Sequence, residues 1–453
     1  MTRRFLGVAT LTLILAACGG GGAAPSAAPV SSPASAAPAS KPAAAASGAA
    51  SASAKPAASG AAAASGAAAA SGSFDGTILL GAPLSLTGST SNEGKLTKDG
   101  YDLWVDIINS KGGINVGGKH YKVEVKYYDD QSKQDQAALL TDKLISQDKV
   151  QFLLGPYGTA STFAASAISE RNKVPMVDTA GAALSIFERG FKYIFGVLSP
   201  GVKYLTGVED AWLAQSPKPT KAAVLSANDA FSLEVGKAAS DYAKQKGMDV
   251  VYDQSYPADT KDLSSALNQV KAGGADVLIG SGHLDDSLVM MKQVKSLGIN
   301  FKGIALSVGP STPEFSKALG PDADYVMSGV QWVPEQKDKD AIIGSAQDYA
   351  QAFNKKYGYV PEYHNAEATA GGVVLQMAIE KAGSLDRDKV RDALAATDVD
   401  TFFGHVKFDS KGLNSDKPMV EIQLQNGGKL IPVWPEAAAT GKVQWPMPAW
   451  NSR

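Results

Sequence analysis

From Phe74 onward, short apolar runs alternate with longer amphipathic segments, and this alternation constrains the fold more than any other feature of the sequence. Ile78-Leu79-Leu80-Gly81 has the length and composition of a buried strand, and residues 95–110 carry apolar side chains at helical spacing. The same order recurs along the chain. Regular strand–helix alternation is typical of a parallel sheet with helices on both faces, so the sequence predicts an α/β fold.

The alternation falls into two runs that meet near Leu198-Ser199-Pro200, which predicts two doubly wound parallel-sheet lobes. The expected strands are 78–81, 123–128, 152–154 and 175–177 in the first run and 222–226, 249–253, 276–280 and 301–306 in the second. The last third is less regular, which indicates that the chain passes back between the lobes. Its expected elements are a strand near 326–332, helices at 340–356, 365–382 and 386–396, and strands at 402–408 and 419–424.

The first eighteen residues have the features of an export signal. Thr2-Arg3-Arg4 is a basic start, and Phe5 to Ala17 is an apolar run of thirteen residues, too short for a permanent membrane span. The run ends Ala16-Ala17-Cys18-Gly19, which resembles a bacterial lipobox, where the cysteine is lipidated and becomes the mature N-terminus. We therefore expect a signal peptide over 1–17 and a membrane anchor at Cys18. An ordinary secretory peptide with an incidental cysteine is the alternative.

Residues 18–73 are expected to form a disordered tether. After Cys18 the segment contains only Ala, Gly, Ser and Pro, apart from Val30, Lys41 and Lys55. Such a composition cannot bury enough apolar surface to pack a core. The tether would leave the body near a membrane but free to move, and no second apolar stretch of spanning length occurs in the sequence.

Charge and composition exclude several classes of function. The chain has 43 Lys+Arg and 45 Asp+Glu, so it lacks the basic excess of a general nucleic-acid binder. One cysteine leaves no disulfide framework or Cys-rich zinc site, and four histidines offer few candidates for a His-based active site. No Gly-x-Ser-x-Gly follows a strand and no phosphate-binding Gly-x-x-x-x-Gly-Lys-Ser/Thr occurs. We expect no enzyme activity, metal or cofactor.

Two loops are candidates for a ligand site. Residues 158–162 follow the strand at 152–154 and begin a helix, and residues 179–183 follow the strand at 175–177. Ligands of open α/β sheets bind beyond the carboxyl ends of the strands. Small residues let backbone N–H groups approach a ligand, and a helix N-terminus favours a carboxylate or an amide oxygen.

The order of motifs along the body resembles the extracytoplasmic substrate-binding proteins of ABC importers, in particular the Leu/Ile/Val-binding type. The similarity extends over roughly 76–435, and the lipobox-like segment precedes it in the sequence. Its motifs are Gly81-Ala82-Pro83-Leu84-Ser85-Leu86-Thr87-Gly88, Ile108-Asn109-Ser110-Lys111-Gly112-Gly113-Ile114, Tyr128-Asp129-Asp130, the 155–162 loop, Tyr256-Pro257-Ala258-Asp259-Thr260-Lys261-Asp262, and Lys292-Gln293 before Leu297-Gly298. The resemblance implies a type I periplasmic-binding-protein fold, with two lobes joined by three crossovers that close over one small ligand.

The resemblance also implies the domain boundaries. Crossovers are expected near 198–202, 328–334 and 403–408. The expected parts are lobe I at 74–198 plus 333–403, lobe II at 199–332 plus 404–435, and a C-terminal tail at 436–453.

In the family's amino-acid binders the first loop holds the ligand carboxylate, and Thr159, Ala160 and Ser161 occupy that loop here. The second loop supplies a carbonyl and a hydroxyl. Ala180 fits the carbonyl role, but the hydroxyl position is Ala182, which has no hydroxyl to offer. This departure weakens the assignment to an α-amino acid.

From the second lobe, the family's ammonium-pairing acid aligns with Asp286, so Asp286→Ala is expected to abolish ligand binding, and the aromatic residue that covers the ligand aligns with Phe231. Glu93 takes a position that is often aromatic in the family and would favour a donor-rich ligand. His283 is a candidate ligand contact, whereas helix N-capping is the structural alternative for the acids beside it.

Two aromatic residues complete the candidate ligand-binding set. Tyr157 is expected as an apolar wall of the site, with an exposed loop as the alternative. Trp332 is expected at the mouth of the cleft, with core packing as an equal alternative.

The resemblance implies a binding protein that delivers a solute to an ABC permease driven by a separate ATPase. It would be monomeric, lipid-anchored outside the cytoplasm and without nucleic-acid partners. The expected ligand is a branched-chain or other neutral amino acid, or an amide or urea-like compound, and small aromatic acids are compatible too. A sensor that reports to a membrane receptor could have the same sequence features.

Overall fold

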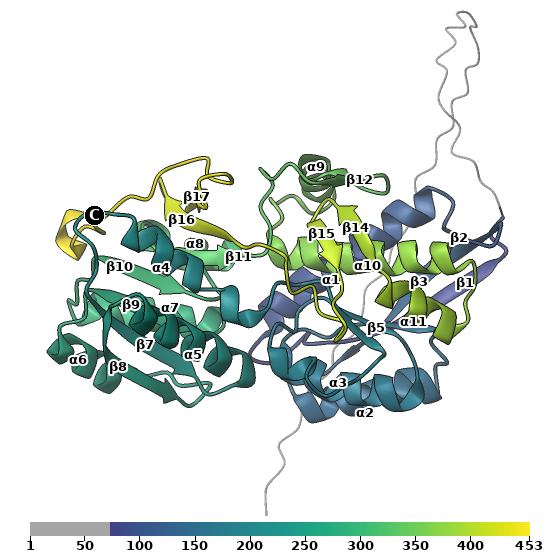
Figure 1. The fold of residues 1–453 in the computed structure, drawn as a ribbon, viewed down its shortest axis with the longest axis horizontal. Helices are drawn as coiled ribbons and strands as arrows, with labels where there is room; N and C mark the ends of the chain where they lie inside the picture. The colour runs from purple at the N-terminus through teal and green to yellow at the C-terminus, as the bar shows by residue number, and fades with distance from the viewer. Residues whose placement is uncertain (1–72) are drawn as a thin grey trace, which may run out of the picture. The chain divides into compact units, whose positions relative to one another are not determined.

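The computed structural model describes residues 73–453 and contains the two predicted sheets (Figure 1). The predicted signal peptide, the lipidation site Cys18 and the tether up to residue 72 lie outside the described residues. We call the part built on the first sheet lobe I and the part built on the second sheet lobe II. The predicted α/β fold is confirmed.

The sheet of lobe I has six strands in the order β2-β3-β1-β4-β5-β6. Its strands are β1 (Gly76–Leu84), β2 (Ile114–Val116), β3 (Lys119–Asp129), β4 (Phe152–Leu154), β5 (Met176–Asp178) and β6 (Ile194–Gly196). All neighbours are parallel except the β2–β3 pair at one edge. The strands are short and apolar at the centre of the sheet, as expected when both faces are covered.

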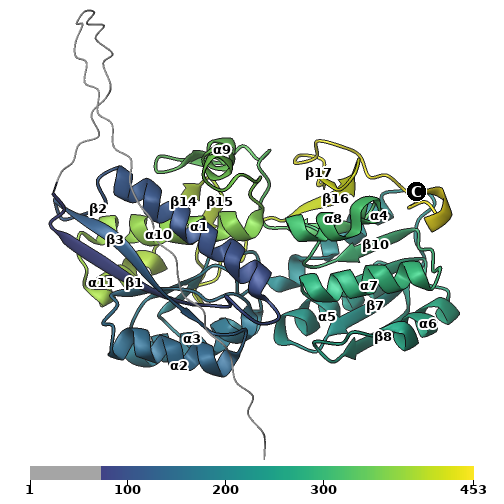
Figure 2. The same cartoon turned by 180° about the vertical axis from the view of Figure 1, so that it is seen from behind.

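Helices cover both faces of this sheet (Figure 2). The helices are α1 (Ser91–Ser110), α2 (Gln134–Ser146), α3 (Thr159–Asn172), α10 (Tyr363–Ala382) and α11 (Arg387–Ala395). Helix α2 packs beside α3, while α1 packs along α10 with α11 next to it. The α1–α10 contact is close because Gly372 lies against Trp104, where a Cβ atom at position 372 would be 2.3 Å from the indole ring. Helix α10 therefore requires a residue without a side chain at this point.

The sheet of lobe II has seven strands in the order β17-β16-β11-β10-β9-β7-β8. Its strands are β7 (Lys221–Ala227), β8 (Asp249–Tyr256), β9 (Val277–Ser281), β10 (Gly303–Leu306), β11 (Met327–Val330), β16 (Val420–Gln425) and β17 (Lys429–Trp434). Strand β16 runs antiparallel to both β11 and β17, whereas the others are parallel. The packed helices are α4 (Thr206–Leu213), α5 (Ala230–Gln245), α6 (Ser264–Gly273), α7 (Leu284–Ser296) and α8 (Pro313–Leu319).

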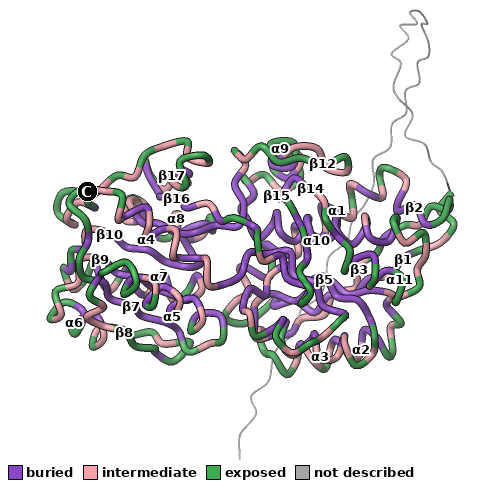
Figure 3. The backbone as a smooth tube through the Cα atoms, viewed as in Figure 1, coloured by how far each residue is buried: buried purple, intermediate pink, exposed green. Residues whose placement is uncertain are grey.

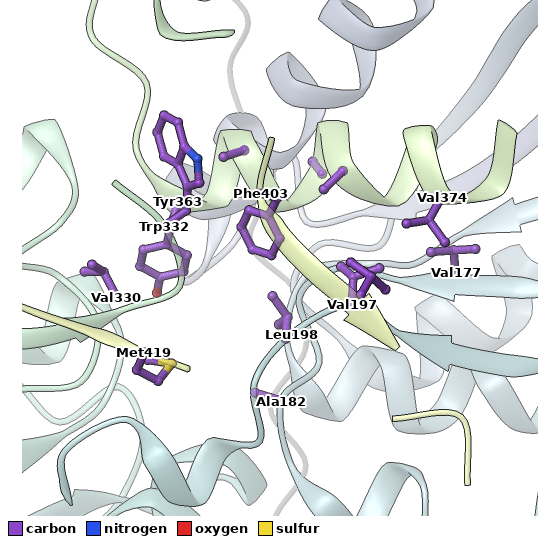
Figure 4. Close-up of a cluster of buried hydrophobic side chains, with 14 of the residues drawn as sticks. Val177, Ala182, Val197, Leu198, Val330, Trp332, Tyr363, Val374, Phe403 and Met419 are labelled. Atoms are coloured by element: carbon purple, nitrogen blue, oxygen red, sulfur yellow. The ribbon is translucent and has the colours of Figure 1, made fainter. Parts of the chain in front are cut away.

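The chain passes between the sheets three times. It first crosses after β6 on the way to α4, and crosses again after β11 on the way to helix α9 (Ala346–Tyr357) of lobe I. Figure 3 shows buried backbone running along both sheets and through the region that joins them. Figure 4 shows side chains from these connections, among them Leu198, Trp332 and Met419, gathered beside α10.

The third connection lies at 414–419 and not at 403–408, where the sequence predicted it. Residues 404–407 instead form β15 (Gly404–Lys407), which pairs with β14 (Asp398–Thr401). The chain then stays on lobe I, since Phe408 packs on Phe195 and Leu413 bridges to Gly196. The predicted position of this crossover was wrong because β14 and β15 pair with each other as an antiparallel hairpin. The chain therefore stays on lobe I through this segment and reaches lobe II only later.

The helix predicted at 340–356 begins later. Its N-cap is Ser345, whose hydroxyl accepts the Asp348 N–H, and a two-stranded ladder of β12 (Lys339–Asp340) and β13 (Gly344–Ser345) precedes it. None of the helices between residues 73 and 453 is both long enough and apolar enough to span a membrane.

Candidate functional site

The carboxyl ends of β4 and β5 in lobe I face the first turns of α5 and α7 in lobe II, and two cavities lie at this junction. The outer cavity has a volume of about 250 Å³ and the inner cavity about 10 Å³. Both are lined by Tyr157, Gly158, Thr159 and His283, so they share a wall from each lobe. This is the position that the type I fold predicts for a ligand.

The first turn of α3 supplies the lobe I side of both cavities. Gly158 precedes the helix with φ +82°, a conformation that suits glycine, and Thr159, Ala160 and Ser161 follow it. The Thr159 Oγ1 accepts the Ala183 N–H at 3.4 Å, which ties the two predicted loops together. The N–H groups of a helix's first turn have no intrahelical partner and carry partial positive charge, so this turn is suited to a carboxylate.

The second loop is held by a buried acid at the end of β5. The Asp178 Oδ1 accepts the N–H groups of Ala180 at 3.1 Å and Gly181 at 2.8 Å. Ala180 lines the inner cavity, as its predicted role requires. Ala182 lies elsewhere: it is buried in the core, and its carbonyl accepts the Gly201 N–H of the first connection at 2.7 Å. The structure therefore places Ala182 outside both cavities.

Burial raises the pKa of Asp178 from its ordinary value to about 7, against the lowering effect of the N–H groups that it accepts. An acid whose pKa is raised by folding binds its proton more tightly in the folded state. Its contribution to stability is therefore complete at low pH and is lost as the pH rises from about 4 to about 7. The free energy at stake is roughly 1.4 kcal/mol for each pKa unit.

Asp178→Asn is expected to remove this pH dependence, because the amide keeps an oxygen for the two loop N–H groups but does not ionise. Urea denaturation at pH 5 and pH 8 should show the variant gaining stability over the wild type as the pH rises, by roughly 2–4 kcal/mol. A difference between the two proteins that does not change with pH would contradict this assignment.

His283 stands between the two lobes. Its Nδ1 lies 3.2 Å from the Tyr157 hydroxyl of lobe I, and its ring packs on Phe231 at 5.7 Å between centroids. Tyr157 also approaches His364, with 3.4 Å between the hydroxyl and Nε2. The structure thus brings together three of the predicted residues, Tyr157, Phe231 and His283, and Tyr157 is buried, not in an exposed loop.

The two predicted acids have structural partners. Glu93, in the first turn of α1, accepts the Leu284 N–H of lobe II through Oε1 at 3.1 Å, so it links the lobes. Asp286 accepts the His283 N–H through Oδ2 at 3.0 Å and caps α7. Asp286 lines the outer cavity but not the inner one. Desolvation by burial raises its pKa.

Trp332 lies outside the two cavities that contain Tyr157 and His283. It lines a third cavity of about 350 Å³ beside the second connection, to which both lobes contribute residues, and it packs edge-on against Tyr349 at 5.4 Å and donates its Nε1–H to the Phe402 carbonyl at 3.1 Å. The side chain is 2% exposed. The core-packing alternative holds because the chain turns into lobe I directly after β11 and carries this ring with it.

The predicted ligand-binding set lacked five side chains that line the inner cavity: Tyr204, Val308, Tyr363, His364 and Glu367. Tyr204 follows the first connection, Val308 follows β10, and the other three lie on the first two turns of α10. A signal for Glu367 was present, since it is the single acid of residues 366–375, which are otherwise Ala, Thr, Gly, Val and Leu and are all buried. Over 73–453, no three or more His, Cys, Asp or Glu side chains are grouped to hold a metal ion.

Comparison with known proteins gives the same architecture. A family model described as "Periplasmic binding protein" matches residues 77–429. The Leu/Ile/Val-binding protein homolog 7 of Brucella suis is 28% identical over 377 residues, which covers 80% of this chain and 91% of the relative. Homolog 8 of Brucella abortus is 27% identical over 383 residues, covering 81% and 93%.

Solved structures agree in fold. The branched-chain amino acid transporter substrate binding protein of Streptococcus pneumoniae, in complex with isoleucine, superposes with a TM-score of 0.69 at 22% identity and covers 78% of this chain and 97% of its own. A solute binding protein of R. palustris, in complex with benzoate, superposes with a TM-score of 0.69 at 19% identity and covers 81% and 99%.

Proposed function

Since the chain belongs to the periplasmic binding protein family, we propose that it is the extracytoplasmic solute-binding component of an ABC importer. It captures a small carboxylate-bearing solute between its lobes and delivers it to a membrane permease with a separate ATPase. The observation that carries this proposal is the shared wall of the cavities, where the first turn of α3 from lobe I faces His283 from lobe II.

Capture follows from the contacts that exist only when the lobes meet. The Tyr157–His283 and Glu93–Leu284 contacts each join one lobe to the other. A solute that touches both walls has more contacts in this closed arrangement than in an open one, and this difference in affinity shifts the population toward closure. The closed form is the one that would dock on the permease.

The walls of the outer and inner cavities together are compatible with two ligand classes. Neutral amino acids are the first, as for the isoleucine-bound S. pneumoniae protein. Small aromatic acids are the second candidate, as for the benzoate-bound R. palustris protein. A specific observation supports small aromatic acids. Four aromatic rings line the inner cavity, those of Tyr157, Tyr204, Phe231 and Tyr363.

The test is a thermal-shift panel on the full chain, stripped of bound solute by unfolding and refolding. The panel contains isoleucine, leucine, phenylalanine, benzoate and 4-hydroxybenzoate. A solute at 100 times its dissociation constant stabilises the folded state by about 2.7 kcal/mol. At least one carboxylate is expected to raise the melting temperature. No shift with any of them, and no small molecule in native mass spectrometry of unstripped protein, would contradict the proposal.

We also propose that the protein is a monomer tethered to the membrane by lipid on Cys18 and has no catalytic role. Cys18→Ala is expected to move the protein from the membrane to the soluble fraction, because a signal peptide alone leaves no lasting anchor. Fractionation of cells followed by immunoblotting measures this, with the Ser26→Ala variant as a matched control. Persistent membrane association of Cys18→Ala would exclude the lipid anchor.

A further inference from the structure

A further cavity lies on lobe II, where helix α4 packs over the strands β16 and β17. It has a volume of about 210 Å³. Thr206, Gly207 and Asp210 line it from α4, Glu421 lines it from β16 and Trp434 from β17. We call it the α4 cavity. Among the described residues it shares no lining residue with the outer or the inner cavity, so a ligand bound here would be separate from the solute held between the lobes.

Glu421 is a buried acid of this cavity whose carboxylate is incompletely paired. Its side chain is 2% exposed, and no hydrogen-bond donor of residues 73–453 reaches its Oε2. In the sheet it stands between Gly329 of β11 and Trp434 of β17. Burying a carboxylate without a partner is costly, so such a residue is seldom retained for stability alone.

Two glycines make room for the Glu421 carboxylate. A Cβ atom at Gly207 would lie 2.1 Å from Oε1, and a Cβ atom at Gly329 would lie 2.9 Å from Oε2. Gly207 also lines the α4 cavity, so Oε1 lies at the cavity wall. Glycine is a poorer residue than alanine inside a helix. Helix α4 therefore gives up some helical stability at the point where the carboxylate meets the cavity.

The charged side chains nearest to Glu421 do not neutralise it. Asp210 is itself an acid and pairs with the Lys246 ammonium at 2.7 Å. Lys203, on the rim of the cavity, donates to the Ser415 carbonyl at 2.8 Å. Burial, and after it the charge of Asp210, raises the pKa of Glu421. A cation bound in the cavity would oppose both effects, because a nearby positive charge favours the ionised carboxylate.

We propose that the α4 cavity binds a small organic cation, a primary alkylammonium whose charge pairs with Glu421. The ammonium has three N–H donors. Glu421 accepts one of them, and Thr206 can accept another, because its hydroxyl donates its own hydrogen to the Lys203 carbonyl at 3.4 Å. Trp434 supplies an aromatic wall, and aromatic rings attract organic cations. The volume of about 210 Å³ leaves room for a short alkyl chain beside the charged group.

The experiment measures binding of n-butylammonium to the full chain by calorimetry at pH 8, with 1-butanol as the neutral molecule of the same length. The wild type should bind the ammonium roughly tenfold or more tightly than the alcohol, as expected for a hydrogen bond to a charged group. Glu421→Gln keeps the shape of the side chain without its charge. This variant should bind the ammonium roughly tenfold or more weakly than the wild type.

Glu209→Gln is the matched control. Glu209 is another buried acid of α4, and neither of its oxygens has a hydrogen-bond partner in the described part of the chain. It does not line the α4 cavity. Removing its charge should therefore leave the affinity for n-butylammonium within about twofold of the wild type.

Gly207→Ala tests the same site without removing the acid, and it provides the test if Glu421→Gln does not fold. The added methyl group would lie 2.1 Å from the present position of Oε1, so the Glu421 carboxylate must move. The affinity for n-butylammonium should fall by roughly tenfold. The melting temperature of the unliganded variant should stay close to that of the wild type, because alanine favours the helix and the displaced group is the end of a flexible side chain.

Four binding results would overturn the proposal. They are the absence of n-butylammonium binding, equal affinities for the ammonium and the alcohol, a preference that survives in both Glu421→Gln and Gly207→Ala, and a preference lost in Asp286→Asn but kept in Glu421→Gln. The last result would place the amine in the outer cavity. None of the four would affect the proposed capture of a solute between the lobes, since that site uses other residues.

Discussion

Replacing Ala160 by aspartate is expected to abolish capture of a carboxylate solute while leaving the fold as stable as before, or slightly more so. Ala160 is half-buried in the first turn of α3 and lines the outer cavity. An acid near a helix N-terminus stabilises the helix by about 0.3–1 kcal/mol. The same carboxylate would interact with the partial positive charge at the N-terminus of α3, which the solute needs, and would repel the carboxylate of the solute.

The substitution is expected to lower the affinity for the solute without lowering the stability of the fold. Measuring both therefore distinguishes a blocked site from a damaged protein. We expect affinity for the best carboxylate of the panel to fall by roughly 100-fold or more, since like charges in a desolvated site cost several kcal/mol. Ala160→Asn, which has the same shape without the charge, is the matched control and should lose far less. Equal affinities for the two variants, measured by calorimetry, would show that the carboxylate does not sit at α3.

Replacing Gln331 by methionine is expected to cost roughly 2–5 kcal/mol of unfolding free energy, because it leaves two buried backbone groups without partners. The Gln331 amide pairs with the backbone of Ser199 on both sides, accepting its N–H at 2.9 Å and donating to its carbonyl at 3.2 Å. The Ser199 hydroxyl in turn donates to the Lys417 carbonyl at 2.8 Å. One residue from each connection therefore meets in a single buried network.

Gln336→Met provides the control for this prediction. Gln336 also bonds the backbone through its amide, donating to the Phe402 carbonyl at 3.1 Å, but it is only half-buried, so water can replace the lost bond. Urea denaturation should place Gln336→Met within about 1 kcal/mol of the wild type. Equal losses in the two variants would mean that the Ser199–Gln331–Lys417 network does not hold the connections together.

The sequence was sufficient to predict most of the central strands. A strand buried on both faces must be apolar along its whole length, so runs such as Phe152-Leu153-Leu154 mark β4 residue by residue. The edges were harder. Strands β2 and β17 and the short helix α8 were not predicted, because edge and peripheral elements carry little apolar pattern.

The candidate site was predictable where backbone chemistry defines it and not where tertiary contacts do. The α3 turn follows from a glycine and small residues after a buried strand. The bond from Leu284 to Glu93 joins residues 191 positions apart, and nothing local to either residue indicates it. Glu367 was missed for a similar reason, since only the folding of α10 against lobe I brings it to the inner cavity.

Trp332 is a further residue whose surroundings could not be predicted from the sequence. Its place directly after a predicted strand and beside a crossover was equally consistent with the cleft and with the core. The structure turns the ring toward Tyr349 and Phe402, where it fills space between the second connection and α9. Direction of a side chain at a chain crossing depends on where the next element packs, which the local sequence does not specify.

The most direct test of capture between the lobes is hydrogen–deuterium exchange on the full chain, with and without the panel solute that gives the largest thermal shift. The account predicts slower exchange on both sides of the cavities at once, in peptides covering 157–162 of lobe I and 229–233 and 282–287 of lobe II. Protection confined to one lobe would contradict the claim that the solute is held between the two.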